Sequence, residues 1–330
     1  MKHLERGLFG QNSFWRYLGV TLFLFIVVSL VGAIPLAGVL IYKMISTGVY
    51  PDTSNVNALD FSIYGISKNT GLALMLLMYV AMFFVFKWIV KPIHGRTLNE
   101  TVNGRNFIRK NRIWTGMLVW GACLAVSFIV GLVSSPQDYA LQFNLAKFIP
   151  LLLIVILILP FQTSFEEIFF RGYLSQGVAK WTKNRWWVLV IISLTFGLMH
   201  AANPEVKEFG FWAAMPQYIL MGFLLGFVSI LDDGIEIALG MHFINNAFGS
   251  LLTTHSASAL QTDAIYEIKN IDATTDLLSL IVMIGITIAI LQRIYKWDFR
   301  VMNRRIEPEL PPVPQYIPPA IPNEGTLQNP

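Results

Sequence analysis

Residues 148–171 read FIPLLLIVILILPFQTSFEEIFFR, and this stretch decides the fold class. Its first part, Phe148–Phe165, carries no charged side chain and is rich in Leu and Ile. A helix needs about 20 mostly apolar residues to cross the lipid core of a membrane. Lipid offers the backbone no hydrogen-bond partners, so such a run must be helical. We therefore predict a transmembrane helix that leads into two adjacent carboxylates, Glu166 and Glu167.

The composition of the whole chain agrees with a protein embedded in lipid. Of its 330 residues, 55% are hydrophobic and 13% are charged, whereas soluble domains average about 25% charged residues. This composition excludes a disordered chain, a coiled coil and an ordinary soluble domain. The single cysteine, Cys123, excludes an intramolecular disulfide and a cysteine-based metal cluster. A net charge of +4 is too small to suggest a nucleic-acid partner.

Further uncharged runs of similar length predict an all-α, polytopic transmembrane helical bundle of about eight spans. The predicted spans are Tyr17–Tyr42, Gly71–Phe86, Ile113–Val133, Phe148–Phe165, Trp186–Met199, Phe209–Leu231, Ile237–Thr254 and Leu277–Gln292. These runs are too long and too evenly apolar for barrel strands. The first run is longer than the apolar core of a signal peptide, so we interpret it as a retained span.

Basic residues are distributed unevenly among the predicted loops, and this distribution predicts the orientation. Residues 87–112, between the second and third spans, contain seven Lys and Arg residues. Residues 171–185 and 293–305 are also basic, whereas residues 256–276 hold four acidic side chains and one Lys. Because loops rich in Lys and Arg stay in the cytoplasm, both termini are predicted to be cytoplasmic. The loop with Asp232, Asp233 and Glu236 contains no basic residue and does not contribute to this test.

Polar side chains beside the apolar runs are candidates for function, because ionised groups in lipid are costly. Glu167 and Arg171 are four residues apart on a helix, so we expect an ion pair between them. Glu166 points about 100° away from Glu167 and has no evident local partner. A carboxylate without a partner in apolar surroundings suits proton transfer. Glu166 is therefore a candidate general base, and Glu167 a structural group.

Two later spans carry histidines one helical turn away from a second residue of interest. Phe196 precedes His200 at the end of the fifth span, and His242 shares a face of the seventh span with Asn246. Each pattern alone is also compatible with polar contacts between helices. Asn245 points elsewhere and is interpreted as structural. Together with the candidate base, these residues supply a partner imidazole and two neutral donors, which suits water activation and oxyanion stabilisation.

The order of these motifs resembles a known family. The series Glu166-Glu167-x-x-x-Arg171, Phe196-x-x-x-His200 and His242-x-x-x-Asn246 is similar to the three motifs of the CPBP family. This family comprises the CAAX-processing and bacteriocin-processing intramembrane endopeptidases, which include the prenyl-protein endopeptidase Rce1. The resemblance covers about residues 148–254, and it leaves the first 110 residues and the proline-rich C-terminus uncovered.

The resemblance implies a glutamic-type intramembrane endopeptidase, with no cofactor or metal assigned. Glu166 would take a proton from water, and His200 would hold and polarise that water. His242 and Asn246 would donate to the oxyanion of the tetrahedral intermediate. The supporting residues would be Glu167, Arg171 and Phe196. A water-filled cavity open to the cytoplasm would admit the substrate.

The implied substrate is a membrane-anchored peptide or protein. The best-known relatives cut prenylated C-terminal CaaX peptides. If the source is bacterial, a peptide or membrane protein of bacteriocin maturation or immunity is the better expectation.

Other chemistries fit the sequence less well. His200, His242 and Glu166 could form a three-ligand zinc site, although no His-Glu-x-x-His motif is present. The residues around Ser175 do not match a nucleophile elbow, and Cys123 has no His or Asn nearby in the sequence. A proton-coupled transporter is a further alternative, although no inverted repeat is visible. The last alternative is a non-catalytic bacteriocin-immunity or scaffold protein.

The chain is accordingly divided into four parts. Residues 1–146 are expected to hold N-terminal transmembrane helices and a basic cytoplasmic loop, and residues 147–255 the CPBP catalytic core. Residues 256–305 form the last loop and the final transmembrane helix. Residues 306–330 hold 8 of the 16 prolines and predict a disordered tail or a docking segment for a proline-binding partner. The expected location is an integral, multi-pass position in a lipid bilayer, the plasma membrane if the source is bacterial.

Overall fold

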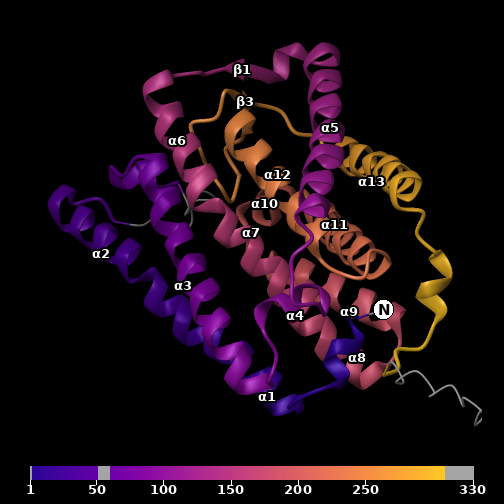
Figure 1. Ribbon diagram of the computed structural model, residues 1–330. Helices are drawn as coiled ribbons and strands as arrows, with labels where there is room; N and C mark the ends of the chain where they lie inside the picture. Colours follow the sequence, from indigo (N-terminus) through magenta and orange to yellow (C-terminus); the bar gives the residue numbers. More distant parts are fainter. Residues whose placement is uncertain (1, 51–59, 309–330) are drawn as a thin grey trace, which may run out of the picture.

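The structure, a computed structural model, describes residues 2–50 and 60–308 and consists mainly of helices (Figure 1). The helices are α1 (Phe14–Leu22), α2 (Ser29–Thr47), α3 (Lys68–His94), α4 (Leu98–Asn103), α5 (Lys110–Ser134), α6 (Leu145–Leu157), α7 (Leu159–Glu167), α8 (Ser175–Thr182), α9 (Arg185–Met199), α10 (Pro204–Phe209), α11 (Phe211–Leu231), α12 (Glu236–Leu252) and α13 (Ala273–Tyr295). π-helical segments at Phe23–Val28 and Ile168–Leu174 join α1 to α2 and α7 to α8. The predicted all-α class is confirmed.

The predicted spans are helical, and six of the described helical segments are long and apolar enough to cross a membrane. These segments are Phe14–Thr47, Lys68–His94, Lys110–Ser134, Leu145–Thr182, Phe211–Leu231 and Ala273–Tyr295. The other two predicted spans correspond to α9 with 15 residues and α12 with 17. Trp212 and Val133, which are 87% and 76% exposed, illustrate the apolar outer surface that faces lipid. The protein is thus an integral, multi-pass membrane protein.

The helical segment Leu145–Thr182 carries the glutamates and is not a regular helix along its length. Pro160 lies at the start of α7, where a proline loses no helical hydrogen bond. Its ring would, however, clash with a helical turn directly before it, so α6 cannot continue unbroken into α7. α6 accordingly ends at Leu157, and α7 begins at Leu159. The chain then adopts the wider π-helical geometry immediately after Glu167. π-helical turns inside α-helices occur frequently at functional sites.

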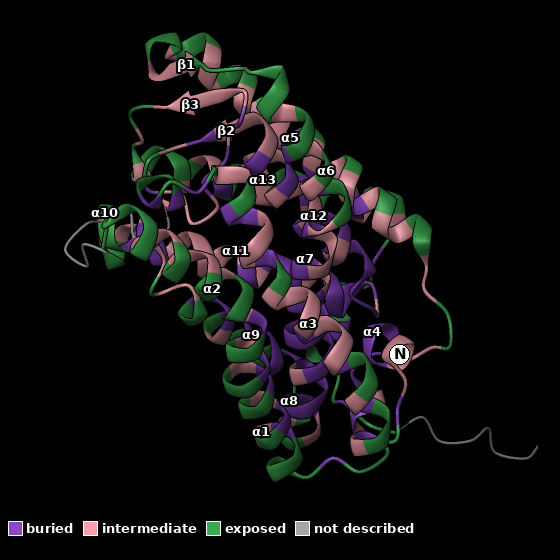
Figure 2. Ribbon diagram, turned by 90° about the vertical axis from the view of Figure 1, so that its left-hand side faces the viewer, coloured by how far each residue is buried: buried purple, intermediate pink, exposed green. Residues whose placement is uncertain are grey.

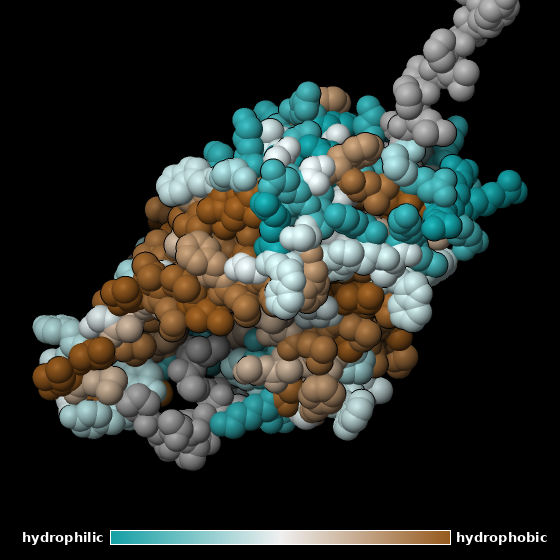
Figure 3. Space-filling model, turned by 90° about the horizontal axis from the view of Figure 1, so that it is seen from below, coloured by the Kyte–Doolittle hydropathy of each residue, from teal (hydrophilic) through white to brown (hydrophobic). Residues whose placement is uncertain are grey.

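The two ends of the bundle differ in structure and in charge. At one end lies a small sheet that we did not predict, in which β3 (Tyr266–Ile268) pairs antiparallel with β1 (Tyr139–Leu141) and parallel with β2 (Thr253–Thr254). The N-terminus, α4 and α8 lie toward the other end (Figure 1). Seen from this end, hydrophilic residues gather in one area that hydrophobic residues border (Figure 3). By its basic loops, this hydrophilic end is predicted to be the cytoplasmic one.

The acidic turn between α11 and α12 contains no basic residue of its own. Its carboxylates pair with arginines of another loop. Arg109, from the basic loop 87–112, forms ion pairs with Asp232 at 3.1 Å and Glu236 at 2.5 Å. Arg105 pairs with Asp233 at 2.7 Å. The side chains of Asp232 and Glu236 are buried. The positive charge that this turn needs is therefore supplied by another cytoplasmic loop.

Close contact between α5 and α12 depends on glycines. A Cβ on Gly240 would come within 2.0 Å of the Ile113 carbonyl oxygen, and one on Gly116 within 2.2 Å of the Ile237 carbonyl oxygen. Small residues allow membrane helices to approach this closely. The contact positions α12, which carries His242 and Asn246.

We expect Gly240→Ala to lower the free energy of unfolding by about 1–3 kcal/mol, because the two helices must move apart. Gly249 lies on the same helix, and a Cβ added there would have no atom within 4 Å, so Gly249→Ala is the matched control. The control is expected to be neutral or slightly stabilising, since Gly in a helix costs about 0.5–1 kcal/mol relative to Ala. Unfolding in mixed detergent micelles measures both variants. Equal destabilisation by the two substitutions would contradict the packing argument.

Ile306, the first residue of the predicted tail, packs against the rest of the protein. Ile306 is buried, and its amide donates to the Lys183 carbonyl oxygen at 2.9 Å. This residue therefore belongs to the folded part of the chain. Residues 309–330, which hold most of the predicted tail, lie outside the described residues.

Candidate active site

Glu167 is fully buried and holds two other site residues in place. Its Oε1 accepts hydrogen bonds from Arg171 Nη1 at 2.8 Å and from His242 Nδ1 at 2.7 Å. The predicted pairing with Arg171 is present, and the bond to His242 was not foreseen. The Arg171 guanidinium also lies 4.0 Å from the centre of the Phe196 ring. One carboxylate thus links the first motif to the third, and Phe196 connects the second motif to both.

Glu166 points to a different set of groups. Its Oε1 accepts a hydrogen bond from Gln162 Nε2 at 2.6 Å, and its Oε2 lies 3.7 Å from His242 Nε2. Among the described residues, Oε2 has no hydrogen-bond donor of its own. The Tyr79 side chain of α3 interacts electrostatically with the same carboxyl group. Gln162 thus fixes one oxygen of the Glu166 carboxylate, and the other oxygen is buried beside His242.

The hydrogen bonds of the two imidazoles define which nitrogen faces the site. Glu167 accepts from His242 Nδ1, so Nε2 is the nitrogen turned toward Glu166. His200 Nδ1 lies 2.8 Å from the Phe196 carbonyl oxygen, which can only accept, so Nδ1 is the donor there. In a neutral ring, Nε2 of His200 is then an acceptor. Such an acceptor can hold a water molecule by one of its protons.

Phe196 lies close to both imidazole rings. Its ring centre is 4.7 Å from that of His200 and 6.1 Å from that of His242. His200 also stacks on Tyr218 at 4.6 Å between ring centres, with an interplanar angle of 21°. These aromatic contacts fix the orientation of the His200 ring, which lies just after the last residue of α9.

The side chain of Gln162, which we did not predict, links Asn246 to the candidate base Glu166. Asn246 Nδ2 donates to Gln162 Oε1 at 3.1 Å, and Gln162 in turn donates to Glu166. The second hydrogen on Nδ2 of Asn246 is not used in this bond. Asn245 donates to Asn246 and accepts from Trp120 Nε1 at 3.1 Å, in agreement with its predicted structural role. Gln162 lies four residues before Glu166, and this helical spacing could have revealed it in the sequence.

We expect Gln162→Met to reduce the rate of any reaction at this site by about 10- to 100-fold, because hydrogen bonds to charged groups contribute about 1.5–3 kcal/mol. Methionine keeps the length of the side chain and removes both hydrogen bonds. Gln217→Met, which removes a bond to the Ala273 carbonyl oxygen of another helix, is the matched control. The ratio of the two rates is the relevant measurement. Equal rates for the two variants would show that Gln162 does not position Glu166 or Asn246.

The described residues contain no group of three or more His, Cys, Asp or Glu side chains that could hold a metal ion. The three residues considered as zinc ligands, His200, His242 and Glu166, are therefore not arranged as one ligand set. Hydrogen bonds connect Glu166, Gln162 and Asn246, and a second set connects Glu167, Arg171 and His242.

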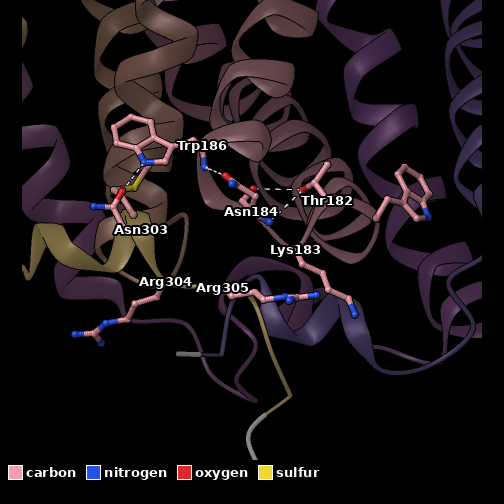
Figure 4. Close-up of a pocket in the computed structure, with 9 residues that line it drawn as sticks. Thr182, Lys183, Asn184, Trp186, Asn303, Arg304 and Arg305 are labelled. Carbon is pink, nitrogen blue, oxygen red and sulfur yellow. Dashed lines mark hydrogen bonds between the residues drawn. The ribbon is translucent and has the colours of Figure 1, made fainter.

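A cavity of about 590 Å³ opens elsewhere, at the hydrophilic end (Figure 4). It is lined by the turn between α8 and α9 and by the segment after α13, including Asn184, Trp186 and Arg305. Trp186 is fixed there by a hydrogen bond from its Nε1 to Asn303. None of the motif residues lines this cavity, so it is separate from the candidate active site.

Fold and site together describe an integral membrane protein with a buried carboxylate, imidazole and amide network. Residues 145–248 match the family model of the type II CAAX prenyl endopeptidase Rce1-like proteins. The chain is also 30% identical over 262 residues to the uncharacterized protein YyaK of Bacillus subtilis (strain 168), with 78% of this chain and 84% of YyaK covered. No solved structure matches the chain. The chain therefore belongs to the Rce1-like family, which is a family of proteases.

Proposed function

We propose that this protein is a glutamic-type intramembrane endopeptidase that hydrolyses a peptide bond of a membrane-associated peptide or protein. The observation that carries the proposal is the placement of Glu166, with Oε2 facing His242 Nε2 at 3.7 Å and Oε1 fixed by Gln162. This separation leaves one water molecule within reach of both groups. Membership of a protease family supports the same reaction class.

The first step is the attack of water on the peptide carbonyl group. Glu166 Oε2 takes a proton from the water, whose oxygen forms a bond to the carbonyl carbon. The electrons of the carbonyl double bond move onto its oxygen, which becomes negatively charged. The acceptor nitrogen of His200 holds the second proton of the water and so orients it.

The second step breaks the bond between the carbonyl carbon and the leaving nitrogen. The free hydrogen on Asn246 Nδ2 stabilises the oxyanion, as does His242 Nε2 when the ring carries both protons. As the intermediate collapses, Glu166 returns its proton to the leaving amine. The products are a new carboxyl terminus and a new amino terminus, and the glutamate regains its charge.

Comparison of protein termini tests this proposal and identifies the substrate in the same experiment. Membranes from cells that produce the wild-type chain are compared with membranes from cells that produce Glu166→Gln, and new N-termini are identified by mass spectrometry. We expect a small set of termini that occur only with the wild type, and the purified protein should cut peptides that span them. Identical termini in both samples would favour a non-catalytic role, such as immunity, scaffolding or transport.

A further inference from the structure

We propose that the cavity beside the turn between α8 and α9 binds the phosphate headgroup of an anionic phospholipid from the leaflet at the hydrophilic end of the bundle. Three features support this assignment: the bonded walls of the cavity, the positive charge of its lining and the apolar helix face that begins beside it. The assignment goes beyond the proposed function and is independent of it, because binding a lipid here requires none of the motif residues.

Two segments that are far apart in the sequence form the walls of the cavity. The Lys183 carbonyl oxygen accepts a hydrogen bond from the Ile306 amide at 2.9 Å, and Asn184 pairs with Arg305 in an isolated antiparallel bridge. These bonds join the turn before α9 to residues 302–306. The cavity of about 590 Å³ is therefore held between two bonded segments. A preformed site of this kind costs little ordering entropy when a ligand binds.

The lining of the cavity is positively charged. Lys183, Arg304 and Arg305 line it, and no Asp or Glu is among the described residues that do so. No ion pair within the described part of the chain involves Lys183. Arg304 pairs with Asp298 at 2.5 Å, and Arg305 lies 3.8 Å from Glu307, but all four of these side chains are exposed. Exposed pairs contribute little, so the cavity attracts an anion.

The side chains of two of these cations extend to the same side of the cavity. Figure 4 shows Lys183 and Arg305 running in one direction, whereas Arg304 points the other way. The start of α9 also lies at the cavity, where Asn184 Oδ1 accepts from the Trp186 amide at 2.9 Å. A helix start carries partial positive charge. An ammonium and a guanidinium can only donate hydrogen bonds, and phosphate oxygens can only accept them, so the groups are complementary.

An apolar helix face begins beside the cavity and favours a lipid over a free phosphate ion. Exposed apolar residues recur at helical spacing along α9: Trp187, Val190, Ile191, Leu194 and Leu198. Trp181 and Trp186, which line the cavity, are exposed as well. Tryptophan is enriched at the level of the lipid headgroups. A phospholipid with its phosphate in the cavity would place its acyl chains against this face of α9.

A lipid bound here would connect helices that carry two of the three motifs. α8 continues the helical segment of Glu166 and Arg171, and α9 ends just before His200. The phosphate would add bonds between the turn that joins these helices and residues 302–306. A ligand that binds only the folded protein stabilises it. Anionic lipid is therefore expected to raise the unfolding midpoint of the protein in detergent.

Lipid binding to the full chain in a neutral detergent tests the proposal. Native mass spectrometry counts the bound lipids during titration with phosphatidylglycerol or with phosphatidylcholine that has the same acyl chains, and a third series adds inorganic phosphate as a competitor. The variant with Lys183→Gln and Arg305→Gln removes two positive charges from the cavity. The control variant with Lys91→Gln and Lys110→Gln removes two from exposed positions outside the cavity lining.

We expect the cavity variant to bind phosphatidylglycerol about tenfold more weakly than the wild type, because basic side chains near anionic lipid each add several-fold to the affinity. The control should bind as the wild type does. Equal weakening in both variants would overturn the proposal, and so would equal binding of the two lipids. Displacement of phosphatidylglycerol by an equal concentration of inorganic phosphate would assign the cavity to free phosphate and overturn the lipid assignment.

Thiol labelling tests the same cavity if the double substitution disturbs folding. Cys123 is the chain's only cysteine, so Cys123→Ala provides a cysteine-free background. Thr182→Cys places a thiol in the cavity lining, and Gln11→Cys places one at an exposed position outside it. We expect phosphatidylglycerol to slow the reaction of Thr182→Cys with an uncharged maleimide about fivefold or more relative to phosphatidylcholine, and to leave Gln11→Cys unchanged. Equal rates for Thr182→Cys in the two lipids would contradict the assignment.

Discussion

Glu166→Gln is expected to reduce the rate of peptide cleavage by about 10²- to 10⁴-fold, the usual contribution of a general base. Glutamine has the same shape, and its Oε1 can still accept the hydrogen bond from Gln162. It cannot take a proton from water at neutral pH. The fold should therefore persist while the first chemical step fails.

The control for this variant is Glu208→Gln, which removes a carboxylate from an exposed position on α10. Rates are measured with purified proteins on a peptide identified by the comparison of termini, and unfolding midpoints are measured in the same detergent. We expect the control to cleave at the wild-type rate and both variants to unfold at the wild-type midpoint. If Glu166→Gln cleaves within about twofold of the wild type, Glu166 is not the base.

Arg171→Met is expected to lower the free energy of unfolding by about 3–5 kcal/mol, because it leaves a buried carboxylate without its counter-charge. Neither Arg171 nor Glu167 has an exposed side chain, and 2.8 Å separates their charged groups. The guanidinium also loses its contact with Phe196. This is the largest stability effect that we expect from a single substitution in the site.

The double variant Glu167→Gln and Arg171→Met distinguishes a lost charge pair from lost packing. Glutamine at 167 can still accept the hydrogen bond from His242 Nδ1, and no unpaired charge remains. We expect the double variant to recover most of the stability lost in Arg171→Met, as replacement of whole buried ion pairs is often close to neutral. A double variant no more stable than Arg171→Met would mean that the charge pair is not what stabilises this region. Unfolding midpoints of the wild type, Arg171→Met and the double variant provide the comparison.

The helices and their order could be predicted from sequence because each requires only a long run without charge. The ion pair of Glu167 and Arg171 was predictable for a similar reason, since helical spacing alone brings the two residues together. The different direction of Asn245 was predictable because adjacent residues on a helix point about 100° apart, and Asn245 accepts a hydrogen bond from Trp120. Helix positions, and contacts between residues of the same helix, are thus the features that the sequence reveals most readily.

Features that depend on contacts between distant segments could not be predicted in this way. The bond from His242 to Glu167 joins residues 75 positions apart, and the sheet at the outer end pairs residues 139–141 with residues 266–268. The N-terminal segment likewise meets the first motif, where His3 Nε2 lies 3.0 Å from the Arg171 carbonyl oxygen. Nothing in the pattern of apolar runs indicates which loops meet.

An experimentally determined structure that resolves ordered water most directly tests the central claim, that Glu166 activates water at a single polar site. The account predicts a water molecule within about 3.2 Å of Glu166 Oε2 that also contacts an imidazole nitrogen of His200 or His242. A Glu166 carboxylate bonded only to protein donors, with no solvent near either imidazole, would contradict the account.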